Sequence, residues 1–477
     1  MPNAKVASRL LRWSLAVFVI GVAGFVACDS DTIVVGPDGD AGGEAGAGGD
    51  AQPSDGQAGE DVGSGDATAD ATDAATEADA TMPYVFEHRD INHVLGTGQS
   101  LSVGSQGMPY LTTTQPYDNL TFVTGVLSGG TGLTSFIPLV EGDTLGANQV
   151  ETLSSSFANL VTKMAREELF AGGEAGKNGH DLLVSAHGVG GTAYVGLKKG
   201  TTPFTNGMAQ VTAGKTLAQA AGKSYIVRAV TNVHGESDHV AMNASYQANL
   251  LEWQSDYESG VKAITGQTAP VPMFETQISS WTKYGQATST IPKQQLGAHV
   301  AAPGKVILVG AKYHLQYVAD GVHLTAAGYQ HMGEYYAKAY RRVVLEGKAW
   351  EPVRPKTITR GGAVITVKMH VPVPPLVMDT DKISDPGNYG FEYTDDSGAP
   401  PAIASVAITG PDTVTITLAA APSGANKRLR YAWTGTVGAR AGATTGPRGN
   451  LRDSDATVSP GGYDLSNWCI HFEEAVP

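Results

Sequence analysis

The chain is poor in charge, in cysteine and in long apolar segments. Charged residues make up 16% of its 477 residues, and 32 Lys and Arg stand against 46 Asp and Glu. A basic surface for nucleic acid is therefore not expected. Its two cysteines, Cys28 and Cys469, exclude a disulfide framework, and Cys469 is expected to be a small buried apolar residue. The apolar run at residues 13–27 is shorter than the roughly 20 residues that a membrane-spanning helix needs.

The first 28 residues have the composition of an export signal. Three positive charges (Lys5, Arg9 and Arg12) precede the apolar run, which ends in Phe25-Val26-Ala27-Cys28. This ending resembles a bacterial lipobox, in which the cysteine is acylated and becomes the mature N-terminus. We expect residues 1–28 to be a lipoprotein signal peptide and Cys28 to anchor the protein in the cell envelope, outside the cytoplasm. Ordinary cleavage near Cys28, with secretion, and an uncleaved anchor are the alternatives.

Residues 29–82 are dominated by Ala, Gly and Asp. They contain 14 acidic side chains and no Lys or Arg, which leaves a net charge of only −3 on residues 83–477. A segment with so few large apolar side chains cannot offset the entropy lost on ordering. We therefore expect an extended acidic linker that holds the folded part away from the envelope.

Between residues 83 and 350, short apolar runs alternate with amphipathic helical stretches. This alternation predicts an α/β domain with a parallel five-stranded sheet flanked by helices. The strands are expected at 93–96, 182–186, 225–231, 271–275 and 306–310. The helices are expected at 150–170, 206–221, 244–264 and 325–346.

Polar, glycine-rich segments follow these strands, and ligands bind at the carboxyl ends of parallel strands. Ser100 follows the first strand in Gly96-Thr97-Gly98-Gln99-Ser100, where the glycines permit a tight turn. Asp320 and His323 follow the fifth strand, in Asp320-Gly321-Val322-His323 just before a helix. One turn would bring this carboxylate against the imidazole, as a serine hydrolase requires. The sequence therefore predicts Ser100 as nucleophile, His323 as base and Asp320 as the group that orients it.

Four motifs in the order Gly98-Gln99-Ser100, Gly190-Gly191-Thr192, His234-Gly235-Glu236-Ser237-Asp238 and Asp320-Gly321-Val322-His323 resemble those of SGNH hydrolases. They are most similar to the sialate O-acetylesterase and acetylxylan esterase branch, over about residues 90–347. The resemblance implies a flavodoxin-like fold and the removal of acetyl groups from carbohydrate. It also implies an oxyanion hole formed by the amides of Ser100 and Gly191 and by an Asn or Gln side chain.

Two positions depart from the pattern of the family. His234 stands where the family has Gln, and a neutral imidazole can also donate one hydrogen bond. We therefore expect His234 to complete the oxyanion hole, with Asn232 as the fallback donor. Leu101 stands where the family often has Asn. Gln99 and Glu236 are expected to support the site, although Glu236 is equally compatible with a place on the surface.

Alternative sites and functions remain open. Histidines recur in the same loops, but their spacing matches no closed zinc pattern, so we expect neither metal nor cofactor. Trp281 is a candidate to stack on a sugar, although a buried tryptophan is the simpler interpretation. A weakly active scaffold that serves as a surface glycan-binding lipoprotein and a general lipase or polyester esterase are the alternatives to a carbohydrate acetylesterase.

The last part of the chain, residues 351–477, has short β-rich runs separated by turns rich in Gly, Pro and Asp. This pattern predicts an all-β, sandwich-like domain. Trp350-Glu351-Pro352-Val353-Arg354-Pro355 is expected to be the linker before it. Residues 449–454 resemble a segment near the end of sialate O-acetylesterase-type chains. Packing against the catalytic domain and glycan binding are both compatible with this domain.

Overall fold

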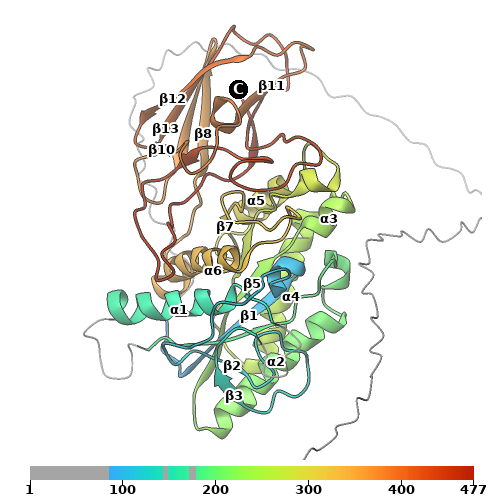
Figure 1. Cartoon of the computed structure of the whole chain (residues 1–477), viewed down its shortest axis with the longest axis vertical. Helices are drawn as coiled ribbons and strands as arrows, with labels where there is room; N and C mark the ends of the chain where they lie inside the picture. Colours follow the sequence, from blue (N-terminus) through green and yellow to red (C-terminus); the bar gives the residue numbers. More distant parts are fainter. Residues whose placement is uncertain (1–84, 143–148, 171–178) are drawn as a thin grey trace, which may run out of the picture. The chain divides into compact units, whose positions relative to one another are not determined.

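The computed structural model describes residues 85–142, 149–170 and 179–477 (Figure 1). The predicted signal peptide, Cys28 and the acidic linker lie outside the described residues. All the described residues belong to one compact unit, which spans Ala74–Pro477. No helix in this described part of the chain is long and apolar enough to cross a membrane.

The centre of the α/β part is a seven-stranded sheet in the order β3-β2-β4-β1-β5-β6-β7. Its strands are β1 (Ile91–Gly98), β2 (Leu120–Phe122), β3 (Phe136–Pro138), β4 (Leu182–Ala186), β5 (Tyr225–Val233), β6 (Met273–Thr276) and β7 (Val306–Gly310). The mostly parallel sheet is confirmed, but the prediction of five strands is wrong. The two missed strands have three residues each, too few to give a pattern, and β3 pairs antiparallel with β2 at the edge.

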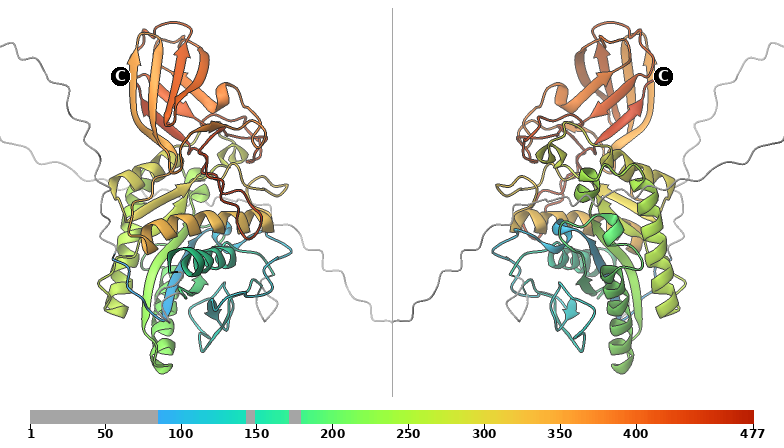
Figure 2. Two further views of the ribbon diagram at one scale, coloured as in Figure 1. Left: turned by 90° about the vertical axis from the view of Figure 1, so that its left-hand side faces the viewer. Right: turned by 90° about the vertical axis from the view of Figure 1, so that its right-hand side faces the viewer.

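Helices cover both faces of this sheet, which explains why every residue of β1 is buried. Val94 packs with α1 and α6 in one hydrophobic core, whereas its neighbour Leu95 packs with α2, α4 and α5 in another. Figures 1 and 2 show α6 beside α1 on one side of the sheet. The helices are α1 (Ser154–Met164), α2 (Thr202–Ala220), α3 (Glu236–Val240), α4 (Tyr246–Thr265), α5 (Ile291–Ala301) and α6 (Ala326–Tyr340). Of these, α3 and α5 were not predicted.

Three short 3-10 helices and two π-helical turns complete the α/β part. The 3-10 helices are η1 (Ser100–Val103), η3 (Tyr194–Gly196) and η4 (Trp281–Tyr284). The π-helical turns η2 (Ala165–Leu169) and η5 (Arg341–Leu345) extend α1 and α6. Helix α6 begins at a true cap, because the hydroxyl of Thr325 accepts a hydrogen bond from the amide of Gly328 at 3.1 Å. This cap fixes the helix that directly follows the Asp320–His323 turn.

The C-terminal part is built from antiparallel sheets, as predicted (Figure 2). One sheet has the order β12-β13-β9-β8, a second has the order β11-β14-β16, and β10 pairs with β15. The strands are β8 (Arg354–Gly361), β9 (Val364–His370), β10 (Val377–Met378), β11 (Phe391–Thr394), β12 (Ile403–Gly410), β13 (Thr413–Leu418), β14 (Arg428–Tyr431), β15 (Leu451–Arg452) and β16 (Phe472–Ala475); η6 (Asn388–Gly390) precedes β11. The expected linker overlaps β8, because an edge strand tolerates Pro355.

One hydrophobic core crosses the predicted boundary at residue 350. Ile365, Val414 and Phe472 of the β part share this core with Leu308 and Tyr313 of the α/β part. The hydroxyl of Tyr313 also donates a hydrogen bond to the carbonyl of residue 469 at 2.6 Å. Cys469 itself is fully buried, and burial raises the pKa of its thiol well above the ordinary value, as expected of an inert core residue. The β part therefore shares its interior with the sheet that precedes it.

Candidate active site

Ser100 lies on a turn that only glycine can form. Gly98 ends β1 with φ +124°, and a Cβ there would lie 2.3 Å from the carbonyl oxygen of Val233. The next residue, Gln99, donates its amide to the same carbonyl at 3.1 Å. The side-chain oxygen of Gln99 accepts a hydrogen bond from the amide of Ser237 at 3.1 Å. Ser100 is thus held at the first position of η1, half-buried, and the side chain of Gln99 links this turn to the start of α3.

Asp320 forms the acidic end of a compact turn. Its Oδ1 accepts hydrogen bonds from the amides of Val322 (2.8 Å) and His323 (3.0 Å), and its Oδ2 lies 2.7 Å from His323 Nδ1. Burial alone would raise the pKa of this carboxyl. The hydrogen bonds from Val322 and His323 nevertheless hold the pKa below its ordinary value. The carboxylate is therefore ionised and accepts the Nδ1 hydrogen of the imidazole.

The second nitrogen of His323 meets the serine. Nε2 lies 2.8 Å from the hydroxyl oxygen of Ser100, across a sequence separation of 223 residues. Because Nδ1 carries a hydrogen toward Asp320, the neutral ring leaves a lone pair on Nε2 for the hydroxyl proton. The imidazole remains 22% exposed, so the relay is open to a substrate. The structure brings together all three residues that were expected to form the triad.

The loop after β4 lies beside Ser100. The amides of His187 and Val189 donate to the carbonyls of Gly96 (2.9 Å) and Gly98 (3.0 Å), which fastens the loop to the end of β1. A Cβ on Gly190 would lie 3.8 Å from Ser100 Cβ. Within the described residues, no group accepts a hydrogen bond from the amide of Gly190 or of the predicted donor Gly191. Both residues are exposed, and Gly190 is the one at which a Cβ would adjoin the serine, so the Gly190–Gly191 turn offers free donors on this side of Ser100.

His234 has a different place from the one expected. Its ring is fully buried, with Nε2 3.0 Å from the carbonyl of Thr192 and Nδ1 2.7 Å from the hydroxyl of Tyr246. Burial lowers the pKa of His234, although Asp238 lies nearby, and so the ring is neutral. A carbonyl only accepts, so Nε2 donates to Thr192 and Nδ1 accepts from Tyr246. Both nitrogens are engaged, and His234 braces the Gly190–Thr192 loop instead of reaching an oxyanion.

Three other residues that were predicted to take part in the site are buried. Asn232, the fallback donor, is fully buried, and neither polar atom of its side chain has a partner within the described residues. Trp281 is fully buried and donates its indole N–H to Ala287 at 3.2 Å, so it offers no face to a sugar. Glu236 is buried rather than on the surface and forms an ion pair with Lys312 at 3.0 Å.

The C-terminal part supplies contacts that motif analysis missed. The amide of Ala441 donates to the carbonyl of Gly321, inside the Asp320–His323 turn, at 3.0 Å. The amide of Gly438 donates to the carbonyl of Thr282 (2.8 Å), and the hydroxyl of Thr282 donates to the carbonyl of Ala439 (2.8 Å). Nothing in the loop at 435–442 distinguishes it from an ordinary Gly-rich turn. Its role is visible only once the two parts of the chain are brought together.

Two further histidines of the loops around the site form hydrogen bonds with other side chains. His187 lies 2.7 Å from the hydroxyl of Tyr257 and 3.0 Å from Gln210, and His239 lies 2.9 Å from Ser289. Across residues 85–142, 149–170 and 179–477, no group of three or more His, Cys, Asp or Glu side chains is arranged to hold a metal ion.

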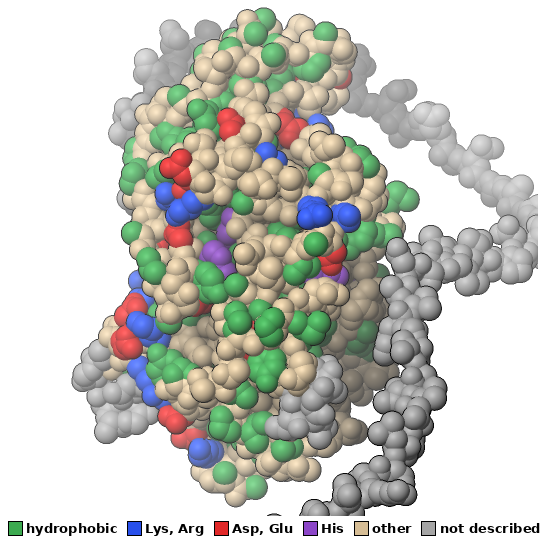
Figure 3. Space-filling view, viewed as in Figure 1, with side chains coloured by type: hydrophobic (Ala, Val, Ile, Leu, Met, Phe, Trp, Pro, Cys, Tyr) green, Lys and Arg blue, Asp and Glu red, His purple; other side chains and the backbone are tan. Residues whose placement is uncertain are grey.

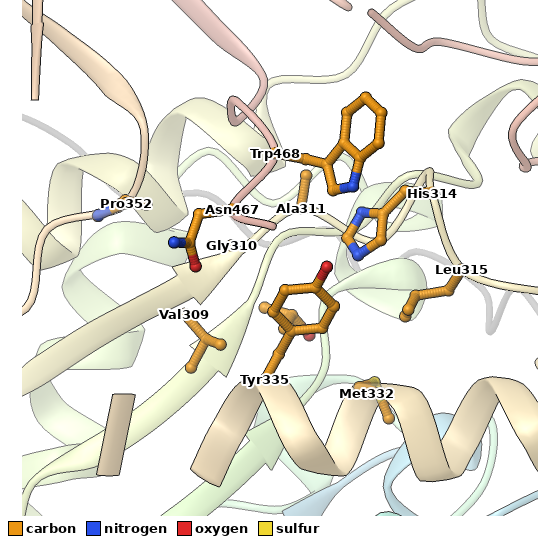
Figure 4. A pocket seen from close by; sticks show the side chains of 11 residues that line it. Val309, Gly310, Ala311, His314, Leu315, Met332, Tyr335, Pro352, Asn467 and Trp468 are labelled. Carbon is orange, nitrogen blue, oxygen red and sulfur yellow. The ribbon is translucent and has the colours of Figure 1, made fainter. Parts of the chain in front are cut away.

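A small cavity is lined by the end of β7 and the loop after it, by α6 and by residues of the C-terminal part (Figure 4). It holds about 10 Å³, room for one water. His314 and Tyr335 line it together with Trp468, whose ring stacks on His314 at 5.9 Å. Burial lowers the pKa of His314 well below its ordinary value, so the ring is neutral. A larger groove of about 980 Å³ lies near the end of α6, but no triad residue lines it.

Comparison with known proteins identifies related folds only. No protein-family model matches the chain, and no curated protein matches it. The structure is similar to that of a carbohydrate acetylesterase from Xanthomonas citri, with a TM-score of 0.52 and 13% identity over 80% of each chain. A protein from Arabidopsis thaliana matches with a TM-score of 0.38 and 17% sequence identity. A carbohydrate acetylesterase from Sinorhizobium meliloti matches with a TM-score of 0.27 and 10% sequence identity. Each of these two matches covers 52% of this chain and 97% of the other chain. The first similarity shows a shared fold that extends beyond the α/β part.

Proposed function

We propose that this protein is a carboxylic ester hydrolase of the SGNH type that removes acetyl groups from carbohydrate. The observation that carries the proposal is the continuous relay from the Ser100 hydroxyl through His323 to Asp320, with distances of 2.8 and 2.7 Å. The relay stands at the carboxyl end of a mostly parallel sheet, where open α/β folds bind ligands. Its fold is shared with a structure described as a carbohydrate acetylesterase, which supports the choice of substrate.

The geometry supports an acyl-enzyme mechanism. His323 Nε2 takes the proton as the Ser100 oxygen attacks the acetyl carbonyl, and Asp320 stabilises the imidazolium that forms. The negative oxygen of the tetrahedral intermediate lies toward the Gly190–Gly191 turn and accepts hydrogen bonds from its free amides and from the Ser100 amide. His323 then returns the proton to the sugar oxygen, which leaves as an alcohol. Water, deprotonated by His323, cleaves the acetyl-serine ester and releases acetate.

The chain contains its own control for the nucleophile. Ser102 is two residues from Ser100 but is buried, and its hydroxyl donates to the carbonyl of Gln99 at 2.7 Å. We expect Ser100→Ala to abolish acetate release from acetylated polysaccharides and labelling by a fluorophosphonate, whereas Ser102→Ala retains both. Asp320→Asn should lower kcat by about 10⁴-fold, as loss of the orienting carboxylate does in other serine triads.

The outcomes separate the candidate functions. Acetate release by Ser100→Ala at the wild-type rate would reject the hydrolase. Glycan binding by the intact protein with no turnover of any acetylated sugar would favour the surface glycan-binding alternative. A rate that rises with acyl chain length on synthetic esters would favour a general lipase.

We also propose that Cys28 anchors the enzyme to the bacterial envelope, facing outside the cytoplasm. The proposal rests on the charged start, the apolar run and the lipobox-like ending of residues 1–28. The wild-type protein should fractionate with membranes and carry lipid on Cys28, whereas Cys28→Ser should be released into the soluble fraction. Identical fractionation of the two proteins would reject the anchor.

A further inference from the structure

The side chain of Arg440 starts against the catalytic turn. A Cβ built on Gly321 would lie 2.5 Å from Arg440 Cβ and 2.6 Å from its Cγ. Gly321 is the residue directly after Asp320, and its φ of +73° favours glycine. Because Gly321 has no side chain, Arg440 can approach its backbone this closely. The aliphatic stem of Arg440 therefore lies beside the peptide that connects Asp320 to His323.

The backbone around Arg440 is fixed from several sides. Its carbonyl accepts a hydrogen bond from the hydroxyl of Thr445 at 2.9 Å. The next amide, that of Ala441, donates to Gly321, and the preceding carbonyl accepts from Thr282. The residue after Thr282 is Lys283, so the backbone of a second basic residue lies beside the same loop. The loop thus presents Arg440 from a defined position at the edge of the site.

These two cations are exposed and have no acidic partner. Within the described residues, neither Arg440 nor Lys283 forms an ion pair. The nearby carboxylates are already occupied: Asp320 by the turn and His323, and Glu236 by Lys312. Figure 3 shows a largely uncharged face on which several Lys and Arg side chains lie next to Asp or Glu side chains. Two exposed cations without an acidic partner, on segments that are hydrogen-bonded to each other, add positive charge to this side of the site.

The reaction geometry determines which part of a substrate reaches this rim. The sugar oxygen must receive its proton from His323 Nε2, whereas the carbonyl oxygen of the ester lies toward Gly190 and Gly191. The sugar therefore leaves on the side of the Asp320–His323 turn, against which Arg440 packs. A guanidinium there is suited to a carboxylate, which it binds through two parallel hydrogen bonds.

We infer that Arg440, assisted by Lys283, selects acetyl esters of sugars that carry a carboxylate close to the ester. The preferred substrate is then an O-acetylated acidic polysaccharide built from uronic acid units, rather than a neutral acetylated xylan. This inference rests on the proposed hydrolase. It adds a specificity determinant that comes from the β part, and it gives that part a role in binding as well as in packing.

The experiment compares one backbone in two charge states. Acetylated oligogalacturonides, their methyl esters and acetylated xylo-oligosaccharides are assayed with the full chain and with Arg440→Gln. The wild-type KM should be about tenfold lower for the free carboxylate than for the methyl ester, the effect of one charged hydrogen bond. Arg440→Gln should remove most of that preference, leave kcat and KM for the neutral substrates within about twofold of wild type, and weaken the dependence of KM on salt, with Lys283 responsible for what remains.

A matched control separates local from general charge effects. Lys305 is exposed and directly precedes β7, at the N-terminal end of the strand, whereas the triad lies at the C-terminal ends of the strands. Lys305→Gln should therefore keep the preference for the carboxylate. An equal loss on charged and neutral substrates in Arg440→Gln would reduce Arg440 to a structural role and overturn the inference. Equal KM values for the carboxylate and its methyl ester in the wild type would also overturn it. Acetate release from none of the substrates, with no labelling of Ser100, would instead reject the hydrolase on which the inference depends.

Discussion

Loss of either partner of the buried ion pair between Lys312 and Glu236 should destabilise the protein strongly and measurably. Both side chains are 1% exposed, and their charged atoms lie 3.0 Å apart. Lys312 is the second residue of the loop that leads from β7 to Asp320, and its amide donates to the hydroxyl of Ser279 at 3.3 Å. Glu236 begins α3, where the next amide holds the side chain of Gln99. The pair thus joins the loop that leads to His323 to the turn that carries Ser100.

Removal of one partner leaves an uncompensated charge in the interior. Lys312→Met should therefore lower the free energy of unfolding by about 3–5 kcal/mol, and Glu236→Leu should act similarly. Replacement of both residues should cost much less than the sum of the two single changes, because no charge is left buried. Urea denaturation followed by tryptophan fluorescence measures each value, with the slope compared among variants to establish a common unfolding transition.

An exposed pair provides the control. Lys368 and Asp412 also lie 3.0 Å apart, but their side chains are 53% and 39% exposed. Lys368→Met should cost at most about 1 kcal/mol. If Lys312→Met cost no more than Lys368→Met, or if the double variant lost the full sum of the single losses, burial would not govern this pair and the reasoning would fail.

Three further predictions concern single positions. Gly321→Ala should lower stability by about 1–3 kcal/mol and abolish turnover, because its φ is +73° and the Cβ would strike the neighbouring loop; Gly362→Ala, at φ +59° in open space, should retain turnover. Burial raises the pKa of Glu275 to about 8, so the folded state keeps a proton that the unfolded state releases above pH 4.5. Wild-type stability should therefore fall as pH rises toward 8, and Glu275→Gln should flatten that fall in urea titrations; parallel profiles would contradict it. His234→Phe should lower kcat about tenfold by freeing the loop at Thr192, and an unchanged kcat would exclude this bracing role.

The triad could be foreseen because its residues follow strands of a parallel sheet. Ser100 comes after β1, and Asp320 and His323 come after β7, so their carboxyl-terminal positions place them at one edge of the sheet. A glycine-rich turn and a short Asp-x-x-His spacing are local features, which the sequence displays directly. Convergence of these residues follows from topology and needs no knowledge of individual contacts.

The remaining roles depend on partners that no local pattern reveals. His234 is turned away from the serine because Thr192 and Tyr246 occupy its two nitrogens. Trp281 is buried against His471, whose ring lies 4.8 Å away at 72°. Each of these contacts joins segments that are distant in the sequence, so composition and spacing cannot predict them. The same holds for the 435–442 loop, which looks like a plain surface turn.

The hydrogen bond from Ala441 to Gly321 bears on how the protein is made. Ribosomes synthesise the chain from its N-terminus, so Ser100 and His323 emerge long before Ala441, whose amide binds the Asp320–His323 turn. A nascent or proteolytically shortened chain that stops before residue 438 would have all three triad residues, yet its acidic turn would lack this tether. Competence for catalysis should therefore arise late in biosynthesis. In the exported hydrolase that we propose, this order of synthesis would delay ester hydrolysis until the C-terminal part has folded.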